Sequence, residues 1–318
     1  MSSVPAFAKL NLGLKVLYKR SDSFHEIATL FQTISLADEL SINAHPASQS
    51  SVTTTSDVEI SGENLATRAA QLLLDANNLC ASVNIHITKR IPMGGGLGGG
   101  SADAAAVLLA LPALLGIPQN PDQLHQIAVK LGMDLPFFLI GGLAQGSGRG
   151  EILTPFDDPD PIHGVLIAPG LHIDTPSAYR SLSRPPQAEL TQAHQDEIMK
   201  KFRALVRSVH KNSPPAVWAD DCENDFEPVA FKQYAALPDL LGRIRATGAR
   251  PARMSGSGST LFGLYETAEA AAAAEAQLKA ELSGHATAIR VEKFHTISRR
   301  HYKRAWHTAL SSLTDGAS

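Results

Sequence analysis

Ile91-Pro92-Met93-Gly94-Gly95-Gly96-Leu97-Gly98-Gly99-Gly100-Ser101-Ala102-Asp103 contains six glycines within seven consecutive positions. Each glycine loses much backbone entropy on folding and has no side chain to pack, so such a run is kept where the backbone takes positive φ or approaches a ligand. Residues 83–88 before it alternate apolar and polar side chains as a half-buried strand does, and residues 104–111 after it are strong helix formers. The sequence therefore predicts a strand, a glycine loop and a helix.

A glycine loop directly before a helix predicts an anion site. Ser101 is a candidate N-cap, and the free N–H groups of the first helical turn would join the loop amides to form a concavity for phosphate. A flexible interdomain linker is the alternative. Linkers are rich in serine, however, whereas this run is bracketed by a strand and an apolar helix. A phosphate-binding loop is the better interpretation.

Two common phosphate loops can be compared with this one. A Walker-type loop needs Lys and then Ser or Thr after its last glycine, but here Ser101-Ala102 follows. Gly94, Gly96 and Gly99 satisfy the dinucleotide fingerprint G-x-G-x-x-G. That fold next needs an acid-tipped strand, but residues 123–130 form another helical segment. Neither class explains the loop.

Composition limits the classes of protein and ligand. The 318 residues are 44% apolar and 19% charged, which predicts a globular chain of one large or two medium domains. A formal charge of −3 provides no excess of basic groups for nucleic acid, so we expect a small-molecule ligand and no nucleic-acid partner. Cys80 and Cys222 form neither a disulfide framework nor a metal cluster, and no apolar run is long enough to span a membrane. We therefore expect a cytoplasmic protein.

The first predicted strand has two chemically different faces. Residues 6–16 alternate with a period of two, so apolar side chains share one face while Lys9 and Asn11 lie side by side on the other. From this pattern alone, a solvated strand face and a functional pair are equal alternatives.

Phe24 and His25 follow a turn-forming stretch. An aromatic ring can stack on a nucleobase, and an imidazole can hydrogen-bond to its edge. A core phenylalanine and an ordinary loop histidine are the structural alternatives. Beyond them we expect a strand at residues 29–34 that continues through 38–42, a polar connection at 45–56 and a helix at 65–74.

Asp134 is an isolated acid among apolar residues. Such an aspartate can cap the following helical turn by accepting its free N–H groups, and that role does not exclude catalysis. A second glycine-rich stretch follows at 141–151, and the acidic, proline-rich residues 157–161 have the composition of an interdomain link. Residues 253–262 place a compact Gly/Ser loop before an apolar strand, where backbone amides can again approach an anion.

The end of the sequence predicts a basic amphipathic helix. Its apolar residues share one helical face: Tyr302, Ala305, Trp306, Ala309 and Leu310. We expect this face to dock on the protein's own domain rather than on a partner chain, and the last residues through Ser318 to be disordered. The predicted division is an N-terminal domain at 1–160, a C-terminal domain at 161–298, and this helix and tail at 299–318.

Residues 92–105, Pro-Met-Gly-Gly-Gly-Leu-Gly-Gly-Gly-Ser-x-Asp-Ala-Ala, resemble the phosphate-binding motif of the GHMP small-molecule kinases. The resemblance is closest to the members that act on 4-diphosphocytidyl-2-C-methyl-D-erythritol, and it covers nearly the whole chain except the tail. Further segments are similar to family motifs: 6–11, 23–26, 132–136, 148–151, 175–179, 224–228 and 255–258. The resemblance implies an α+β fold of two domains, the first like domain 2 of ribosomal protein S5 and the second a ferredoxin-like α/β plait.

The resemblance also implies roles for individual residues. Asp134 would be the catalytic base that takes the proton from the substrate hydroxyl, with Lys9 as its charged partner. ATP binding is implied for the glycine loop and for two residues near the adenine: Pro92, Met93, Gly94, Gly95, Gly96, Leu97, Gly98, Gly99, Gly100 and Ser101, with Asn64 and Lys89. Acceptor binding is implied for Asn11, Phe24, His25, Thr175, Tyr179, Ser255, Gly256 and Ser257. An ordinary strand-end lysine is the alternative for Lys89.

One departure from the family pattern concerns the base-binding residues. The family has Gly and Tyr where this chain has Ser23 and Phe24, and the resemblance places Phe24 and Tyr179 on opposite faces of a cytosine. Phenylalanine keeps the stacking surface but removes any contact through a hydroxyl group.

The resemblance implies ATP-dependent phosphorylation of the 2-hydroxyl of 4-diphosphocytidyl-2-C-methyl-D-erythritol, in the non-mevalonate pathway of isoprenoid synthesis. ATP is the expected co-substrate, Mg²⁺ the expected metal with Ser101 as one candidate ligand, and a monomer or homodimer the expected assembly. A homoserine- or mevalonate-type kinase is one alternative, against which Phe24, His25 and Tyr179 favour a cytidine-bearing substrate. A non-catalytic nucleotide sensor is the other, and the presence of both Lys9 and Asp134 argues against it.

Overall fold

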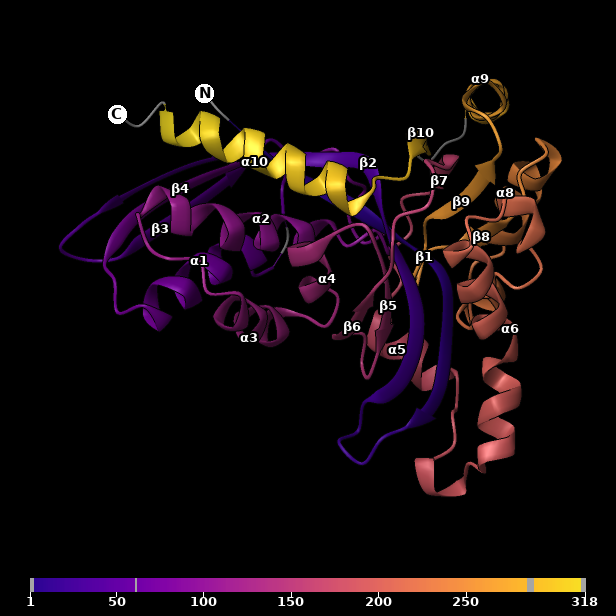
Figure 1. The fold of residues 1–318 in the computed structure, drawn as a ribbon. Helices are drawn as coiled ribbons and strands as arrows, with labels where there is room; N and C mark the ends of the chain where they lie inside the picture. The colour runs from indigo at the N-terminus through magenta and orange to yellow at the C-terminus, as the bar shows by residue number, and fades with distance from the viewer. Residues whose placement is uncertain (1–2, 61, 285–288, 316–318) are drawn as a thin grey trace.

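The structure, a computed structural model, describes residues 3–60, 62–284 and 289–315 and contains two β-sheets flanked by helices (Figure 1). The six-stranded sheet comes mainly from the first half of the chain and the four-stranded sheet from the second half. This mixed arrangement of two sheets and their helices is the α+β architecture that the resemblance implies.

The first sheet has the strand order β3-β4-β2-β5-β6, with β1 also paired to β2. Its strands are β1 (Val4–Lys19), β2 (His25–Pro46), β3 (Ser51–Ser56), β4 (Ala81–Thr88), β5 (Leu143–Ser147) and β6 (Ile152–Pro155). The 22-residue β2 pairs with β1 along one edge, and on the other edge with β5 through residues 29–32 and with β4 through residues 39–46. All these pairings are antiparallel, and β2 therefore joins the two halves of the sheet.

The polar connection predicted at residues 45–56 contains a strand, β3, which pairs in parallel with β4. Its Ser/Thr-rich side chains alternate between exposed and half-buried positions, and none is fully buried. An edge strand of this kind lacks the apolar alternation from which strands are predicted. The connection itself is thus shorter than predicted.

Four helices cover one side of this sheet: α1 (Leu65–Ala76), α2 (Gly99–Leu114), α3 (Pro121–Leu131) and α4 (Leu135–Ile140). The central helix is α2, which packs against β1, β2, α1 and α4. Its N-cap is Gly98 with φ of 74°, so Ser101 lies inside the first turn and the predicted serine cap is wrong. The helix begins earlier because Gly98 takes a left-handed conformation, which glycine adopts without steric cost.

The second sheet has the order β10-β7-β9-β8 with every pair antiparallel. Its strands are β7 (His163–Ala168), β8 (Ala252–Met254), β9 (Leu261–Tyr265) and β10 (Arg290–His295). The helices of this half are α5 (Thr175–Ser181), α6 (Gln192–His210), α7 (Glu227–Gln233), α8 (Ala236–Ala246) and α9 (Ala268–Leu282), with short 3₁₀ turns η1 (Gln187–Glu189) and η2 (Pro215–Val217). Helices α8 and α9 pack on the sheet, as in a ferredoxin-like plait.

Strand β1 contributes to both apolar cores. Leu14 and Val16 near its end pack in the core of the second sheet, whereas the earlier residues pack in the core of the first. Lys9 and Asn11 in its middle are only 2% and 3% exposed. The solvated-face alternative is therefore wrong, because α2 packs against β1 and the loop around Ser255 contacts it from the second half of the chain.

The last helix, α10 (Arg299–Asp315), returns to the first sheet and packs on β1 and α2 (Figure 1). Tyr302 and Trp306, on its predicted apolar face, are buried there, and the Tyr302 hydroxyl donates to the Phe138 carbonyl oxygen. The helix thus docks within its own chain. The predicted disorder at residues 316–318 lies outside the described residues. Within the described ranges, no helix combines the length and apolar character that crossing a membrane requires.

Candidate active site

Two cavities meet at the glycine loop. The smaller, of about 460 Å³, is lined by Asn64, Lys89 and most of the loop, and the larger, of about 780 Å³, contains Lys9 and Asp134. Five residues line both cavities: Gly94, Gly96, Gly98, Ser101 and His172. The loop therefore lines two adjoining ligand-sized spaces, and direct transfer between two bound molecules requires that they lie this close to each other.

The backbone of the glycine loop is packed too closely for side chains. A Cβ on Gly96 would overlap the Ser255 carbonyl oxygen, and one on Gly98 would overlap the Phe138 ring. Hydrogen bonds from other segments hold the loop: the Lys9 backbone N–H donates to Leu97 O at 3.0 Å, the Thr260 N–H donates to Gly95 O at 3.1 Å, and Ser255 Oγ donates to Gly96 O at 3.1 Å. Among the described residues, no protein acceptor is bound to the N–H groups of residues 96–101. These donors are available to an anion.

Lys9 and Asp134 form an ion pair in the larger cavity, with 3.0 Å between Lys9 Nζ and Asp134 Oδ2. Lys9 also donates to Asn11 Oδ1 at 2.5 Å and lies 5.4 Å from the centroid of the Phe31 ring. The Asn11 amide in turn donates to Thr29 Oγ1 at 2.8 Å, so the ammonium is held from behind. Asp134 occupies the N-cap position of α4, but its side chain makes no capping hydrogen bond. The predicted capping role is wrong, because the carboxylate pairs with Lys9 instead.

Aromatic residues line another part of the larger cavity, which we call its aromatic end. The rings of His25 and Tyr179 are stacked, with centroids 5.1 Å apart and planes 20° apart, and Phe24 beside them is half exposed. Burial, together with the charges of Lys19 and Arg184, lowers the pKa of His25. The imidazole is therefore mainly neutral at pH 7, with one nitrogen as donor and the other as acceptor.

A buried charge cluster lies beside the smaller cavity. Lys89 Nζ is 2.5 Å from Asp38 Oδ2 and 2.8 Å from Asp103 Oδ2, and all three side chains are at most 6% exposed. Asp38 Oδ1 also accepts the backbone N–H groups of Arg90 and Ile91, which fixes the start of the loop. Burial raises the pKa of Asp103 to about 7, although the charge of Lys89 opposes this shift. The ammonium of Lys89 is thus engaged within the protein while its side chain lines the cavity.

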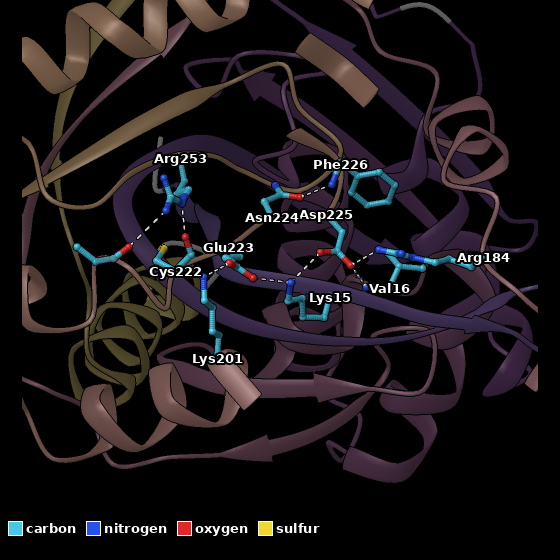
Figure 2. A network of polar contacts seen from close by, with 11 residues as sticks. Lys15, Val16, Arg184, Lys201, Cys222, Glu223, Asn224, Asp225, Phe226 and Arg253 are labelled. Atoms are coloured by element: carbon cyan, nitrogen blue, oxygen red, sulfur yellow. Dashed lines mark hydrogen bonds and ion pairs between the residues drawn. The ribbon is translucent and has the colours of Figure 1, made fainter. Parts of the chain in front are cut away.

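A second polar network joins β1 to the segment 222–226 (Figure 2). Lys15 Nζ lies 2.6 Å from Glu223 Oε2 and 3.0 Å from Asp225 Oδ1. Asp225 also accepts from the Val16 N–H at 3.0 Å and from Arg184 at 2.5 Å. Burial by itself lowers the pKa of Lys15, but the two carboxylates outweigh it and raise the pKa overall. The network fixes the second half of the chain against the strand that carries Lys9.

Asn224 extends this connection to the Gly/Ser loop at 255–258. Its backbone forms a parallel bridge with Leu14, and its amide donates to Met254 O at 2.7 Å and to Gly256 O at 2.8 Å. Ser255 at the start of the loop accepts the Asn11 N–H at 3.2 Å. The loop is therefore tied to β1 at two points, close to the Lys9–Asp134 pair.

Comparison with known proteins identifies the family. The model described as GHMP kinases N terminal domain matches residues 64–142, and that described as GHMP kinases C terminal matches residues 210–284. A 4-diphosphocytidyl-2-C-methyl-D-erythritol kinase from Solibacter usitatus is 43% identical over 97% of this chain and 93% of its own length. The chain belongs to the 4-diphosphocytidyl-2-C-methyl-D-erythritol kinase family.

Solved structures agree with this membership. A crystal structure of 4-(cytidine 5'-diphospho)-2C-methyl-D-erythritol kinase is 37% identical, has a TM-score of 0.73, and is matched over 92% of this chain and 98% of its own. A homoserine kinase from Cytophaga hutchinsonii reaches a TM-score of 0.72 at 18% identity, over 92% of this chain and 94% of its own. The fold is thus shared across GHMP kinases, and sequence identity separates the 4-diphosphocytidyl-2-C-methyl-D-erythritol kinase family from the others.

Most residues predicted for the site line one of the two cavities of this kinase. Thr175 and Ser257 both line the larger cavity, and their hydroxyl oxygens are hydrogen-bonded at 2.9 Å. Asn64 lines the smaller cavity while its side chain caps α1 by accepting the Ala66 N–H. Leu97 and Ser255 line neither cavity, since both side chains are buried behind the loops that they hold.

Several residues at the site of this kinase were not predicted. Thr29 supports Asn11, Asp38 and Asp103 hold Lys89, and the His172 ring lies over the glycine loop, where a Cβ on Gly94 would be 3.0 Å from its Nδ1. Asp103 belongs to the stretch that resembles the GHMP motif, but the resemblance assigned it no role. His172 carries no local signal at all.

Proposed function

We propose that the protein transfers the γ-phosphate of ATP to the 2-hydroxyl of 4-diphosphocytidyl-2-C-methyl-D-erythritol. The observation that carries this proposal is the Lys9–Asp134 ion pair of 3.0 Å, inside the larger cavity and next to the wall that it shares with the smaller one. The names of the relatives supply the acceptor, because the fold is also that of a homoserine kinase.

In this proposal ATP occupies the smaller cavity. The free N–H groups of residues 96–101, at the start of α2, bind its phosphates, and Asn64 and Lys89 lie on the side of the adenine. The terminal phosphate then faces the acceptor in the adjoining larger cavity. Phosphoryl transfer asks mainly for such alignment and for neutralisation of charge on the phosphate oxygens.

Asp134 is the proposed catalytic base. Its side chain is 37% exposed in the larger cavity, so it can accept a hydrogen bond from the acceptor hydroxyl and take its proton as the O–P bond forms. Lys9, held by Asn11, stabilises the negative charge that develops on the acceptor oxygen and on the transferred phosphate. Asn11 thus serves the acceptor side by positioning the lysine as well as by lining the cavity.

The aromatic end of the larger cavity suits a cytosine. His25 and Tyr179 present stacked rings, and Phe24 offers a half-exposed ring next to them. Burial and the charge of Asp134 raise the pKa of Tyr179, so its hydroxyl stays protonated and able to donate. The hydroxyls of Thr175 and Ser257 close this end. A plain alcohol such as homoserine or mevalonate would leave these rings unused.

Mg²⁺ is part of the proposal, and the side chains at the meeting of the cavities fit it. Ser101 lines both cavities, and Asp103 has one carboxylate oxygen, Oδ1, that is buried without a hydrogen-bond partner among the described residues. Hydroxyl and carboxylate oxygens are ligands that Mg²⁺ prefers, and the ion takes few of them from protein when phosphates supply the rest. Bound there, the ion would neutralise charge on the β- and γ-phosphates.

Compartment and assembly complete the proposal. Cys80 and Cys222 are both free thiols, which suits a reducing compartment, so we keep the cytoplasm as the expected location. The expected assembly is a monomer or a homodimer.

The test is an assay of ADP formation against a panel of acceptors. The panel contains 4-diphosphocytidyl-2-C-methyl-D-erythritol, 2-C-methyl-D-erythritol, homoserine and mevalonate, each with ATP and Mg²⁺. We expect turnover with the cytidyl compound and little with the plain alcohols. Preferred turnover of a plain alcohol would contradict the proposed acceptor, and ATP binding without turnover of any acceptor would favour the sensor alternative.

A further inference from the structure

Arg149 lies in the turn between β5 and β6, on the wall of the larger cavity. Its guanidinium carbon is 4.9 Å from the centroid of the Phe24 ring. The next residue in the turn, Gly150, lies close to the carboxylate that is proposed to receive the hydroxyl, since a Cβ on it would be 3.6 Å from Asp134 Oδ1. The turn that carries Arg149 is therefore close to both the Phe24 ring and Asp134.

The hydrogen bonds of Arg149 use its backbone N–H and Nε and leave both Nη atoms available. Glu151 accepts from the Arg149 backbone N–H at 2.6 Å and from Nε at 3.3 Å. Within the described parts of the chain, no hydrogen bond uses the two terminal Nη atoms, and the side chain is 25% exposed. Two parallel N–H donors on a planar fork match the oxygens of a phosphate group.

The charges on the wall of the larger cavity favour an anion. Four basic side chains line it, Lys9, Lys19, Arg149 and Arg180, against a single acidic one, Asp134, among the described residues. This local excess of positive charge contrasts with the net charge of −3 for the whole chain. A cavity lined by one sign of charge raises the local concentration of ligands of the opposite sign.

Arg149 is better placed than Lys9 or Arg180 to contact an anion directly. Lys9 is paired with Asp134 through its single ammonium nitrogen, and Arg180 is 72% exposed and lies 3.7 Å from the carboxylate of Asp174. Arg149 is paired with Glu151 at 3.3 Å, but through Nε, so both of its Nη atoms can still donate. Arg149 is more buried than Arg180, and a partly desolvated guanidinium gains more from a phosphate contact than a fully hydrated one.

We propose that Arg149 binds the diphosphate of the acceptor and thereby selects a nucleoside-diphosphate-linked alcohol over a plain one. This inference rests on the proposed function and adds a specificity-determining residue to the same site. In such an acceptor the diphosphate lies between the base and the alcohol, and the Arg149–Gly150 turn contacts the Phe24 ring with one residue and lies close to Asp134 with the other. The Phe24 ring supports the flat guanidinium from behind through a cation–π contact.

The test compares the binding of CDP and cytidine by isothermal titration calorimetry, because these probes differ only in the diphosphate. Arg149→Met removes the charge but keeps an unbranched side chain of similar length, and Arg149→Lys keeps the charge but loses the fork. Arg180→Met is the matched comparison, since it removes the same charge from the same cavity wall. Thermal unfolding of each variant checks that it is folded.

We expect the wild-type protein to bind CDP more tightly than cytidine. Arg149→Met should weaken CDP binding by about ten-fold or more, the usual size of a charge-assisted contact, and should leave cytidine binding unchanged. Arg149→Lys should recover part of the loss, and Arg180→Met should have a clearly smaller effect. The KM for 4-diphosphocytidyl-2-C-methyl-D-erythritol should follow the CDP affinity.

Two results would overturn this inference while leaving the proposed function intact. One is an unchanged CDP affinity in Arg149→Met. The other is an equal loss of CDP affinity in Arg149→Met and Arg180→Met, which would indicate long-range electrostatic attraction rather than a direct contact. A wild-type protein that binds neither CDP nor cytidine would instead contradict the proposed acceptor itself, and with it the basis of the inference.

Discussion

Replacement of Asp134 by asparagine is expected to remove most of the turnover while leaving the protein folded and able to bind ATP. Asparagine has nearly the same shape but accepts no proton at neutral pH. The side chain lies in the larger cavity, outside the smaller one proposed for ATP. The change therefore separates the proton transfer from nucleotide binding.

The size of the effect follows from the contacts of Asp134. A positioned base contributes about 10²- to 10⁴-fold to rate, or about 3 to 5 kcal/mol of barrier. The stability cost is smaller, because Lys9 keeps its hydrogen bond to Asn11 at 2.5 Å and its contact with the Phe31 ring. The Asp134 side chain is also 37% exposed, so water screens the lost pair. We expect about 1 kcal/mol in the free energy of unfolding, below the cost of breaking a fully buried pair.

The assay measures kcat from ADP release at saturating ATP and acceptor, and the ATP dissociation constant separately without acceptor. Asp239→Asn is the matched control, because Asp239 pairs with Arg243 on α8 at 3.0 Å, is 65% exposed and lines neither cavity. A kcat of Asp134→Asn within ten-fold of the wild-type value would refute its role as base. A loss confined to ATP affinity would refute the separation of the two cavities.

Replacement of both Phe24 and Tyr179 by alanine should raise the KM for the cytidyl acceptor, since stacking contributes about 1–3 kcal/mol per base; an unchanged KM in steady-state kinetics would point to a different acceptor. Asp103→Asn should flatten the pH dependence of stability. The pKa of Asp103 is about 7 in the folded protein and 3.8 ordinarily, so between these values the folded state binds more protons and wild-type stability falls as pH rises. Urea unfolding of both proteins at about pH 4 and about pH 7 measures this fall, and equal falls in the two proteins would contradict the assignment. Trp306→Ala, at a side chain only 6% exposed, should cost about 3–5 kcal/mol of unfolding free energy in the same assay, and a loss under about 1 kcal/mol would mean that α10 is not firmly docked.

Local chemistry made the glycine loop predictable. Gly94–Gly100 lies directly between a strand and a helix, and the physical reason for so many glycines is contained in the residues themselves. The closeness of Lys9 and Asp134 is different. No periodicity relates a residue in the first strand to one before α4, and only the resemblance to a kinase family placed the two together. Their ion pair is a product of the tertiary fold.

Burial was the main quantity that local patterns did not predict. The alternation at Lys9 and Asn11 indicates two faces of a strand. It does not predict that α2 and the Ser255 loop cover these two residues. The same holds for the cluster of Asp38, Lys89 and Asp103, whose members come from three separate elements. Each is an ordinary polar residue in its own segment, and the cost of burying it is offset by the other two and, for Asp38, also by the backbone N–H groups of Arg90 and Ile91.

The docking of α10 on β1 and α2 also affects the order in which the protein can be completed during synthesis. The surface that receives Tyr302 and Trp306 belongs to elements made early, whereas these two side chains leave the ribosome much later. Until then, a nascent chain displays an uncovered apolar patch on the portion that was made first. Chaperones that bind exposed apolar surface would therefore find their target on the N-terminal portion of the chain, and that target is hidden only after Tyr302 and Trp306 have left the ribosome.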